Sequence, residues 1–378
     1  MKREVILHKP VWIPLSRPIQ FFADWSTSRA AYPLGYVPAL DGIRGLMTIG
    51  VLLAHTGMSA AVDGRFIVFM DVFFTMSGWL ITSLLIADHQ KNGHIRFTKF
   101  YLRRYLRLYP ALIAMLLAML CVVLIVSSEV KPRLLEIGVG FVYLTDYWRA
   151  LGGPGVIYTG HLWSLAVEEQ FYLLWPPLFA LILRWLGVSW STVAIIALGT
   201  SGFALWRIWL TSHSADVIYL FTALDMRADS LLNGCGMAVV LKLVNLADYP
   251  RFSRWLMLSL LPISIALVIA GLTIDKDLRW YYYVSPLFGA IPSAALIAAI
   301  LQPQRNFMHR LYEHPIPVFC GRICYGLYVW HWPIFYVMLA NLQFHPLGVL
   351  FVGWPLAFAI SIASYYLIER HFMRARPL

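Results

Sequence analysis

The chain has 378 residues, of which 60% are hydrophobic and 13% are charged, and its formal net charge is +11 at pH 7. The apolar residues form long blocks separated by short basic loops, so the composition predicts an all-α polytopic membrane protein and excludes a soluble domain. Lysine and arginine lie beside the apolar blocks, as they do in cytoplasmic loops. We therefore expect the lipid bilayer, and not nucleic acid, as the partner of this positive charge.

Residues 1–38 mix arginine with tryptophan and phenylalanine and contain no continuous apolar core. No cleavable signal peptide is visible, so we expect the first spanning helix to direct insertion. The composition of this segment is typical of a chain that lies on a membrane surface. The expected organisation is an N-terminal cytoplasmic or interfacial segment (1–38), a membrane domain (39–372) and a cytoplasmic tail (373–378).

Eleven apolar segments are candidates for membrane spans: 42–61, 66–87, 105–127, 134–148, 162–186, 190–210, 217–241, 255–274, 281–301, 317–340 and 346–368. Basic residues at both ends of the chain place both termini in the cytoplasm, which requires an even number of crossings. Segment 134–148 is the shortest, and Gly138 and Gly140 interrupt it. We therefore predict about ten transmembrane helices, with 134–148 as a re-entrant or interfacial segment on the outer side.

The first predicted span, from Ala39 to Gly57, carries Asp41, Arg44 and His55. Eleven residues separate Arg44 from His55, so on a helix both side chains share one face and lie about 16 Å apart along the axis. Because the hydrocarbon core is about 30 Å thick, this spacing places Arg44 at the cytoplasmic interface and His55 near mid-bilayer.

A basic cluster, Arg103, Arg104 and Arg107, precedes Pro110 where the third span leaves the cytoplasm. Arg104 and Arg107 are three residues apart and share a helix face. With Arg44 at the same interface they could bind phosphate groups, since guanidinium binds phosphate oxygens bidentately. Ordinary positive-inside anchoring explains the cluster equally well from spacing alone.

Several ionisable groups fall inside later apolar spans, where each costs a few kcal/mol unless it is paired or functional. Glu169 lies about 12 Å below His161 by helical rise, which approaches the level of His55. Arg227 and Asp229 also fall near mid-bilayer and belong either to a buried ion-pair network that fixes helix packing or to a site. His331 lies in the outer half of its helix, where it suits either a site or an aromatic belt.

The four cysteines all fall inside apolar spans, so neither a disulfide framework nor a metal site is expected.

Together these motifs resemble the membrane-bound acyltransferase family 3, which O-acylates exported glycans. The resemblance covers Tyr36 to Phe372 and rests on six stretches: Leu40–Gly45 followed after ten intervening residues by His55, Asp71–Thr82, Arg104-x-x-Arg107, His161–Tyr172, Tyr325–His331 and Tyr366–Arg370. Two departures stand out. The usual Glu-Arg-Pro ending reads Glu369-Arg370-His371, and no periplasmic hydrolase-like domain follows the membrane domain.

The resemblance implies a ten-span enzyme of the bacterial inner (cytoplasmic) membrane. Such an enzyme takes an acyl group, most often acetyl, from cytoplasmic acetyl-CoA and delivers it to a hydroxyl of an exported or lipid-linked glycan, such as an exopolysaccharide or lipopolysaccharide. By this likeness His55 is the catalytic histidine, Arg44 its partner in the motif, Arg104 and Arg107 hold the phosphates of coenzyme A, and Glu169 is the acidic residue. Either the membrane domain finishes the transfer itself, or a separate periplasmic transferase protein does so as a partner.

As a mechanism, we expect neutral His55 to act as general base on the acceptor hydroxyl, with Glu169 orienting the imidazole and Arg227 balancing that carboxylate. A covalent variant would rest the acyl group on His55 or on Ser77, although Ser77 also suits a small packing residue. Two other functions compete with this one. A transporter or flippase of a lipid-linked sugar or acyl carrier would also have ionisable groups at mid-bilayer, and a membrane scaffold would have them for packing only.

Overall fold

The computed structural model describes residues 37–57, 67–126, 129–153, 155–244, 248–273, 279–301 and 305–374. Every regular element in these ranges is a helix, as the composition predicts. The predicted N-terminal segment lies outside the described residues up to residue 36, and the predicted tail does so from residue 375. Their expected placement on the cytoplasmic side therefore stays a prediction.

Six helical runs in the described part of the chain are long and apolar enough to cross a membrane. They are α4 (Ile67–Asn92), α5 (Phe97–Val126), α9 (Trp190–Ser212), α12 (Pro250–Thr273), α13 (Trp280–Ile300) and the run Pro346–Arg374, which includes α17 (Pro346–Gly348), α18 (Trp354–Ser364) and α19 (Arg370–Arg374). A seventh span forms if α15 (Pro315–Arg322) and the helix Cys324–Asn341, which begins with α16 (Cys324–Tyr336), are taken together across a 72° bend. The structure thus shows a multi-pass membrane protein with fewer clear spans than the ten predicted.

The other three predicted spans are interrupted or polar. Helix α2 (Pro38–Ala54) has only 17 residues because it ends before His55. Predicted span 217–241 is divided into α10 (Val217–Thr222), the short turn η2 (Leu224–Met226) and α11 (Ala228–Leu243). Helix α8 (Trp163–Leu186) is long, but it carries two adjacent glutamates in its N-terminal half.

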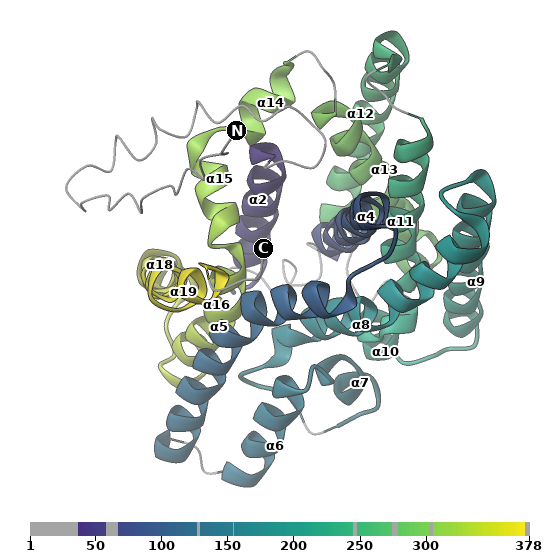
Figure 1. Ribbon diagram of the computed structural model, residues 1–378. Helices are drawn as coiled ribbons and strands as arrows, with labels where there is room; N and C mark the ends of the chain where they lie inside the picture. Colours follow the sequence, from purple (N-terminus) through teal and green to yellow (C-terminus); the bar gives the residue numbers. More distant parts are fainter. Residues whose placement is uncertain are drawn as a thin grey trace, which may run out of the picture. The chain divides into compact units, whose positions relative to one another are not determined.

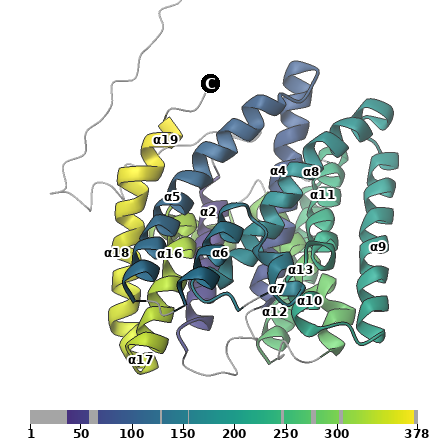
Figure 2. The same cartoon turned by 90° about the horizontal axis from the view of Figure 1, so that it is seen from below.

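Of these helices, α2 and α11 lie among other helices, whereas α8 exposes leucines such as Leu174 and Leu178 along one face. Figure 1 shows α2 and α4 near the middle, with α15 beside α2 and α11 beside α4, and Figure 2 shows α9 and α18 at opposite sides. The outer helix α9 exposes leucines at Leu198 and Leu205, as expected for a face that contacts lipid. Interior helices need no apolar outer face, because protein and not lipid surrounds them.

Glycines allow helices α4 and α11 to approach each other closely. A Cβ placed on Gly234 of α11 would lie 1.8 Å from the carbonyl oxygen of Thr75 on α4, and one on Gly78 of α4 would lie 1.9 Å from the carbonyl oxygen of Leu231. Small residues have the same role where other membrane helices pack backbone to backbone. The α4–α11 contact therefore fixes the position of α4, which carries residues of the candidate site.

We expect Gly234→Ala to destabilise the protein, because the added methyl group has no space and neither backbone can move away freely. Overpacking of this kind costs about 1–3 kcal/mol or more. Gly202→Ala on α9 is the matched control, since nothing lies within 4 Å of its Cβ position. Thermal unfolding of the purified proteins in detergent should show a lower midpoint only for Gly234→Ala, and equal midpoints would contradict the close packing of α4 on α11.

The predicted re-entrant segment 134–148 consists of two short helices, α6 (Val130–Phe141) and α7 (Thr145–Ala150). At 1.5 Å per residue the longer one spans about 18 Å, which is too short for a bilayer core. Arg133 on α6 pairs with Glu136 at 2.9 Å, and Glu136 accepts a hydrogen bond from the backbone N–H of Thr159 at 2.7 Å. These contacts hold the loop that leads to the short helix η1 (Gly160–Leu162), which carries His161.

Candidate active site

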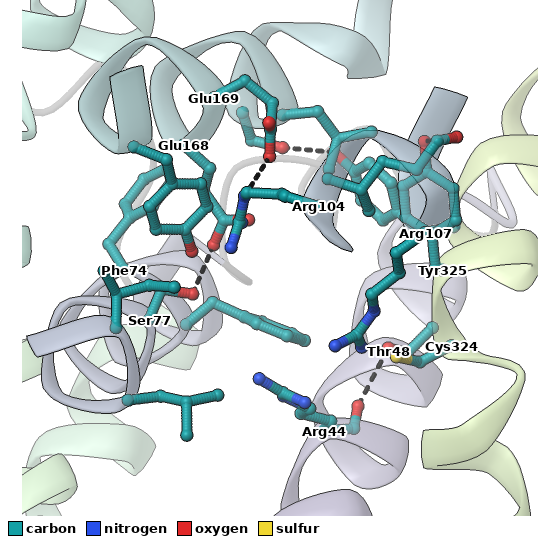
Figure 3. Close-up of a pocket in the computed structure, with 18 of the residues that line it drawn as sticks. Arg44, Thr48, Phe74, Ser77, Arg104, Arg107, Glu168, Glu169, Cys324 and Tyr325 are labelled. Atoms are coloured by element: carbon teal, nitrogen blue, oxygen red, sulfur yellow. Dashed lines mark hydrogen bonds and ion pairs between the residues drawn. The ribbon is translucent and has the colours of Figure 1, made fainter. Parts of the chain in front are cut away.

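A cavity of about 160 Å³ lies between α2, α4, α5, α8 and α16, and arginines from two of these helices line it (Figure 3). Arg44 comes from α2, and Arg104 and Arg107 come from successive turns of α5. The structure thus brings together the three arginines that the spacing predicted to share an interface. Arg103, the fourth predicted donor-binding residue, is exposed and does not line the cavity.

Arg44 and Arg107 carry the unusual charge of this cavity. Their guanidinium groups point toward each other across it (Figure 3), and their mutual repulsion acts on Arg107. In the described part of the chain, neither makes an ion pair with a carboxylate within 4 Å. Asp41 lies close enough to act on Arg107 electrostatically but does not line the cavity. Two facing cations without a bound carboxylate form a site that an anion would stabilise.

Arg104 differs from the other two arginines because it already has a partner. Its Nε donates to Glu169 Oε1 at 3.0 Å, and its guanidinium stacks 3.1 Å above the ring of Tyr172. Glu169 is therefore paired with Arg104. The contact between Glu169 and His55 that the sequence led us to expect is absent. The predicted balancing of this carboxylate by Arg227 is also absent, because Arg104 on the adjacent helix provides it.

Glu168, which the sequence reading did not select, lines the same cavity. Its Oε1 accepts a hydrogen bond from the Ser77 hydroxyl at 2.5 Å (Figure 3). Ser164, Glu168 and Tyr172 follow one another at four-residue intervals, so they form one polar stripe of α8 that faces the cavity. That stripe was readable from the sequence and would have identified Glu168.

Ser77 lines the cavity, and its hydroxyl contacts Glu168 of the neighbouring helix α8 there. The small residue that lets a neighbouring helix approach closely is the next one, Gly78, which packs against α11. The side chains of successive helical residues point about 100° apart, which explains the difference.

A second group of polar residues, three histidines, lies beyond the end of the cavity. His55 Nδ1 lies 2.9 Å from His331 Nε2, and His161 lies against His331 with ring centroids 5.6 Å apart. His161 and His331 are buried, whereas His55 is partly exposed. Among the described residues, no group of three or more histidine, cysteine, aspartate or glutamate side chains is arranged to hold a metal ion.

The shared depth that we predicted for His55 and Glu169 is therefore wrong. His55 shares its level with His161 and His331, and the eight residues from His161 to Glu169 correspond to about 12 Å along α8. The cause is the depth of His161, which was expected at the outer end of its span and lies instead beside His331, so that Glu169 lies at the level of the arginines.

Tyr328 separates the cavity from the histidines. Its hydroxyl lies 2.6 Å from Ser164 Oγ and donates to the carbonyl oxygen of His161 at 2.6 Å. Because that carbonyl can only accept, Ser164 must donate to Tyr328. Tyr328 lies one helical turn from His331 on α16, so this one side chain links the wall of the cavity to the histidine group.

Arg227 and Asp229 belong to a buried network of ion pairs, which is one of the two alternatives left open by the sequence, but they do not pair with each other. Arg227 pairs with Asp71 of α4 at 3.0 Å, and Asp229 pairs with Arg207 of α9 at 2.7 Å. Positions two residues apart at the start of a helix point in different directions, so each side chain meets a different neighbour. None of the four lines the cavity, and the two buried pairs connect α4, α9 and α11, with Tyr281 of α13 also donating to Asp71.

Comparison with known proteins gives a family. A family model described as an acyltransferase domain matches residues 37–370. A peptidoglycan O-acetyltransferase of Listeria monocytogenes is 30% identical over 316 residues, which are 80% of this chain and 50% of that protein. A putative O-acetyltransferase of Staphylococcus aureus (strain COL) is 28% identical over 361 residues, covering 90% of this chain and 58% of its own length.

A putative peptidoglycan O-acetyltransferase of Bacillus subtilis is 27% identical over 312 residues, which are 79% of this chain and 48% of that protein. The chain thus spans about half the length of the curated relatives that it matches. No solved structure matches it.

Proposed function

Because the chain belongs to the acyltransferase family whose domain model matches residues 37–370, we propose that it is a membrane O-acetyltransferase that uses acetyl-CoA as donor. The family match confirms the resemblance seen in the sequence motifs. The observation that carries the proposal is the pair of facing guanidinium groups, Arg44 and Arg107, in a cavity whose far wall adjoins the histidine pair. An anion-binding end and a basic end are what transfer from an anionic thioester to a hydroxyl requires.

In this proposal the phosphate groups of coenzyme A bind at Arg44 and Arg107, and Arg104 stays with Glu169. Drug-sized ligands occupy pockets of about 300–1,000 Å³, so a cavity of about 160 Å³ holds the thioester arm and leaves the nucleotide at its mouth. Tyr328 would have to move for the acyl group to reach His55, because its hydroxyl closes the end of the cavity.

The chemistry at the far end is general-base catalysis. A thioester is already activated, so the protein mainly positions it and removes a proton from the acceptor hydroxyl. His55 is the proposed base, because it is the partly exposed member of the histidine group. Ser77, hydrogen-bonded to Glu168 in the cavity, remains the second proposed acyl carrier if transfer occurs in two steps.

We propose a cell-wall glycan as acceptor, because two of the relatives are named for peptidoglycan. Peptidoglycan is thus tested first, ahead of exopolysaccharide and lipopolysaccharide. A separate periplasmic transferase that completes the transfer is also a proposed partner. A transporter or flippase is not favoured, because the family is one of acyltransferases.

The proposed location is the bacterial inner membrane, with ten crossings, both termini in the cytoplasm and the donor site open to the cytoplasm. In this arrangement α2, α8 and the α10–α11 pair also cross, with α2 and α11 packed among other helices and α8 exposing one apolar face. Inside-out vesicles carrying a tag at each terminus test both points together. Labelled acetyl-CoA added outside should acetylate glycan enclosed in these vesicles, and a protease should remove both tags, whereas right-side-out vesicles should show neither result. Transfer from donor on the periplasmic side would contradict the proposal.

A further inference from the structure

We infer that His331 is a positioning residue that fixes His55 in the tautomer whose Nε2 is free to accept a proton. The inference rests on the proposed function, in which His55 is the general base, and adds the residue that prepares it. From the sequence we assigned this role to Glu169, which pairs with Arg104 in the structure.

The tautomer follows from two contacts of His331. Its Nδ1 lies 3.1 Å from the carbonyl oxygen of Leu327, and a carbonyl oxygen cannot donate, so Nδ1 carries a proton. In neutral His331 the other nitrogen, Nε2, then has the lone pair. Since Nε2 lies 2.9 Å from His55 Nδ1, His55 must donate from Nδ1, which leaves His55 Nε2 unprotonated.

The opposite arrangement would need a charged His331. An imidazolium could donate from both nitrogens and force His55 to accept, but His331 is fully buried. Among the described residues neither ring has an aspartate or glutamate within ion-pairing distance. The two glutamates that line the cavity contact Arg104 and Ser77 instead. Burying a charge without such a partner costs several kcal/mol, so the neutral pair is the stable one.

The surrounding rings hold the two imidazoles in place. The rings of His55 and His331 are nearly parallel, with an interplanar angle of 12° and centroids 5.2 Å apart. Trp332 contacts His55 edge-on at 4.8 Å, and Phe335 contacts His331 edge-on at 5.6 Å. Rotation of either imidazole out of the hydrogen bond would therefore require these rings to move.

The role of this geometry in transfer can be written step by step. The oxygen of the acceptor hydroxyl forms a bond to the thioester carbonyl carbon, and its proton passes to His55 Nε2. The carbon–sulfur bond then breaks, and the leaving thiolate takes the proton from Nε2. Throughout, His55 Nδ1–H stays hydrogen-bonded to His331 Nε2, so the imidazole keeps its orientation and returns to the same tautomer.

The test compares His331→Leu with His331→Gln. Glutamine places its side-chain carbonyl oxygen near the position of His331 Nε2, so it can still accept from His55 Nδ1, whereas leucine cannot accept at all. We expect acetyl transfer to fall about 100-fold or more in His331→Leu, as when a catalytic histidine loses its orienting partner, and to stay within about tenfold of wild type in His331→Gln. Binding of coenzyme A should be unchanged in both, because His331 does not line the donor cavity.

A second readout needs no acceptor glycan. The ¹⁵N chemical shifts of labelled His55 in detergent distinguish a protonated ring nitrogen from an unprotonated one. We expect wild type and His331→Gln to show Nδ1 protonated and Nε2 unprotonated, and His331→Leu to show a mixture of the two neutral tautomers. The same tautomer in all three folded proteins, or equal loss of transfer in the two variants, would overturn the inference. If the wild type transfers no acetyl group, the proposed function fails, but the chemical shifts still decide the tautomer.

Discussion

Replacing His55 with glutamine is expected to lower the rate of acetyl transfer by about a thousandfold while leaving donor binding unchanged. Glutamine can hydrogen-bond to His331 but cannot take a proton from a hydroxyl at neutral pH, and positioned general-base catalysis contributes about 10²–10⁴-fold. His55 does not line the arginine cavity, so the affinity for coenzyme A should stay within twofold of wild type. The measurement is the initial rate of label transfer from acetyl-CoA in vesicles, together with calorimetry of coenzyme A binding in detergent.

His94→Gln is the matched control for this substitution. His94 is exposed in the turn between α4 and α5 and does not belong to the histidine group. The same change of side chain should therefore leave the rate of transfer unaltered. Normal transfer by a folded His55→Gln protein would remove the proposed base. Loss of both transfer and donor binding would instead indicate that the substitution disturbs the fold near the end of α2.

The helical architecture could be predicted because apolar block length decides it. Seven of the eleven apolar segments contain one continuous helical run of similar extent, and α6 and α7 occupy the segment that was expected not to cross. The count of spans could not be predicted as well, because α2 and α11 lie inside the bundle. Surrounded by other helices, they can be short or carry polar residues without exposing them to lipid.

The face of a helix was easier to predict than its end or its partner. Three arginines from α2 and α5 meet in one cavity, as helical spacing indicated. Arg227 and Asp229 were expected in a buried ion-pair network, but their partners, Asp71 and Arg207, could not be identified because they lie on other helices. His55 was expected near Glu169 because His161 was taken to lie at the outer end of its span, whereas it lies beside His331 at the level of His55.

Loss of both guanidinium groups in Arg44→Gln plus Arg107→Gln is expected to raise the dissociation constant for acetyl-CoA about 100-fold or more. Each hydrogen bond to a charged group contributes about 1.5–3 kcal/mol, and 1.4 kcal/mol corresponds to a factor of ten in affinity. Salt should weaken binding to the wild type more than binding to the double variant, because screening acts on the charges that have been removed. Calorimetry at two salt concentrations measures both effects.

The same substitution should not destabilise the protein without donor, and this separates a binding role from a packing role. Arg44 and Arg107 face each other as like charges, so their neutralisation relieves repulsion and should hold or slightly raise the unfolding midpoint. Arg104→Gln should lower the midpoint instead, because it leaves the buried carboxylate of Glu169 without its partner. Arg103→Gln is the control for charge alone, since Arg103 is exposed outside the cavity.

If the double variant binds acetyl-CoA as tightly as wild type, the phosphate site lies elsewhere and the cavity has another ligand. If it binds weakly while keeping a normal midpoint, the unpaired arginines are explained by the anion that they bind.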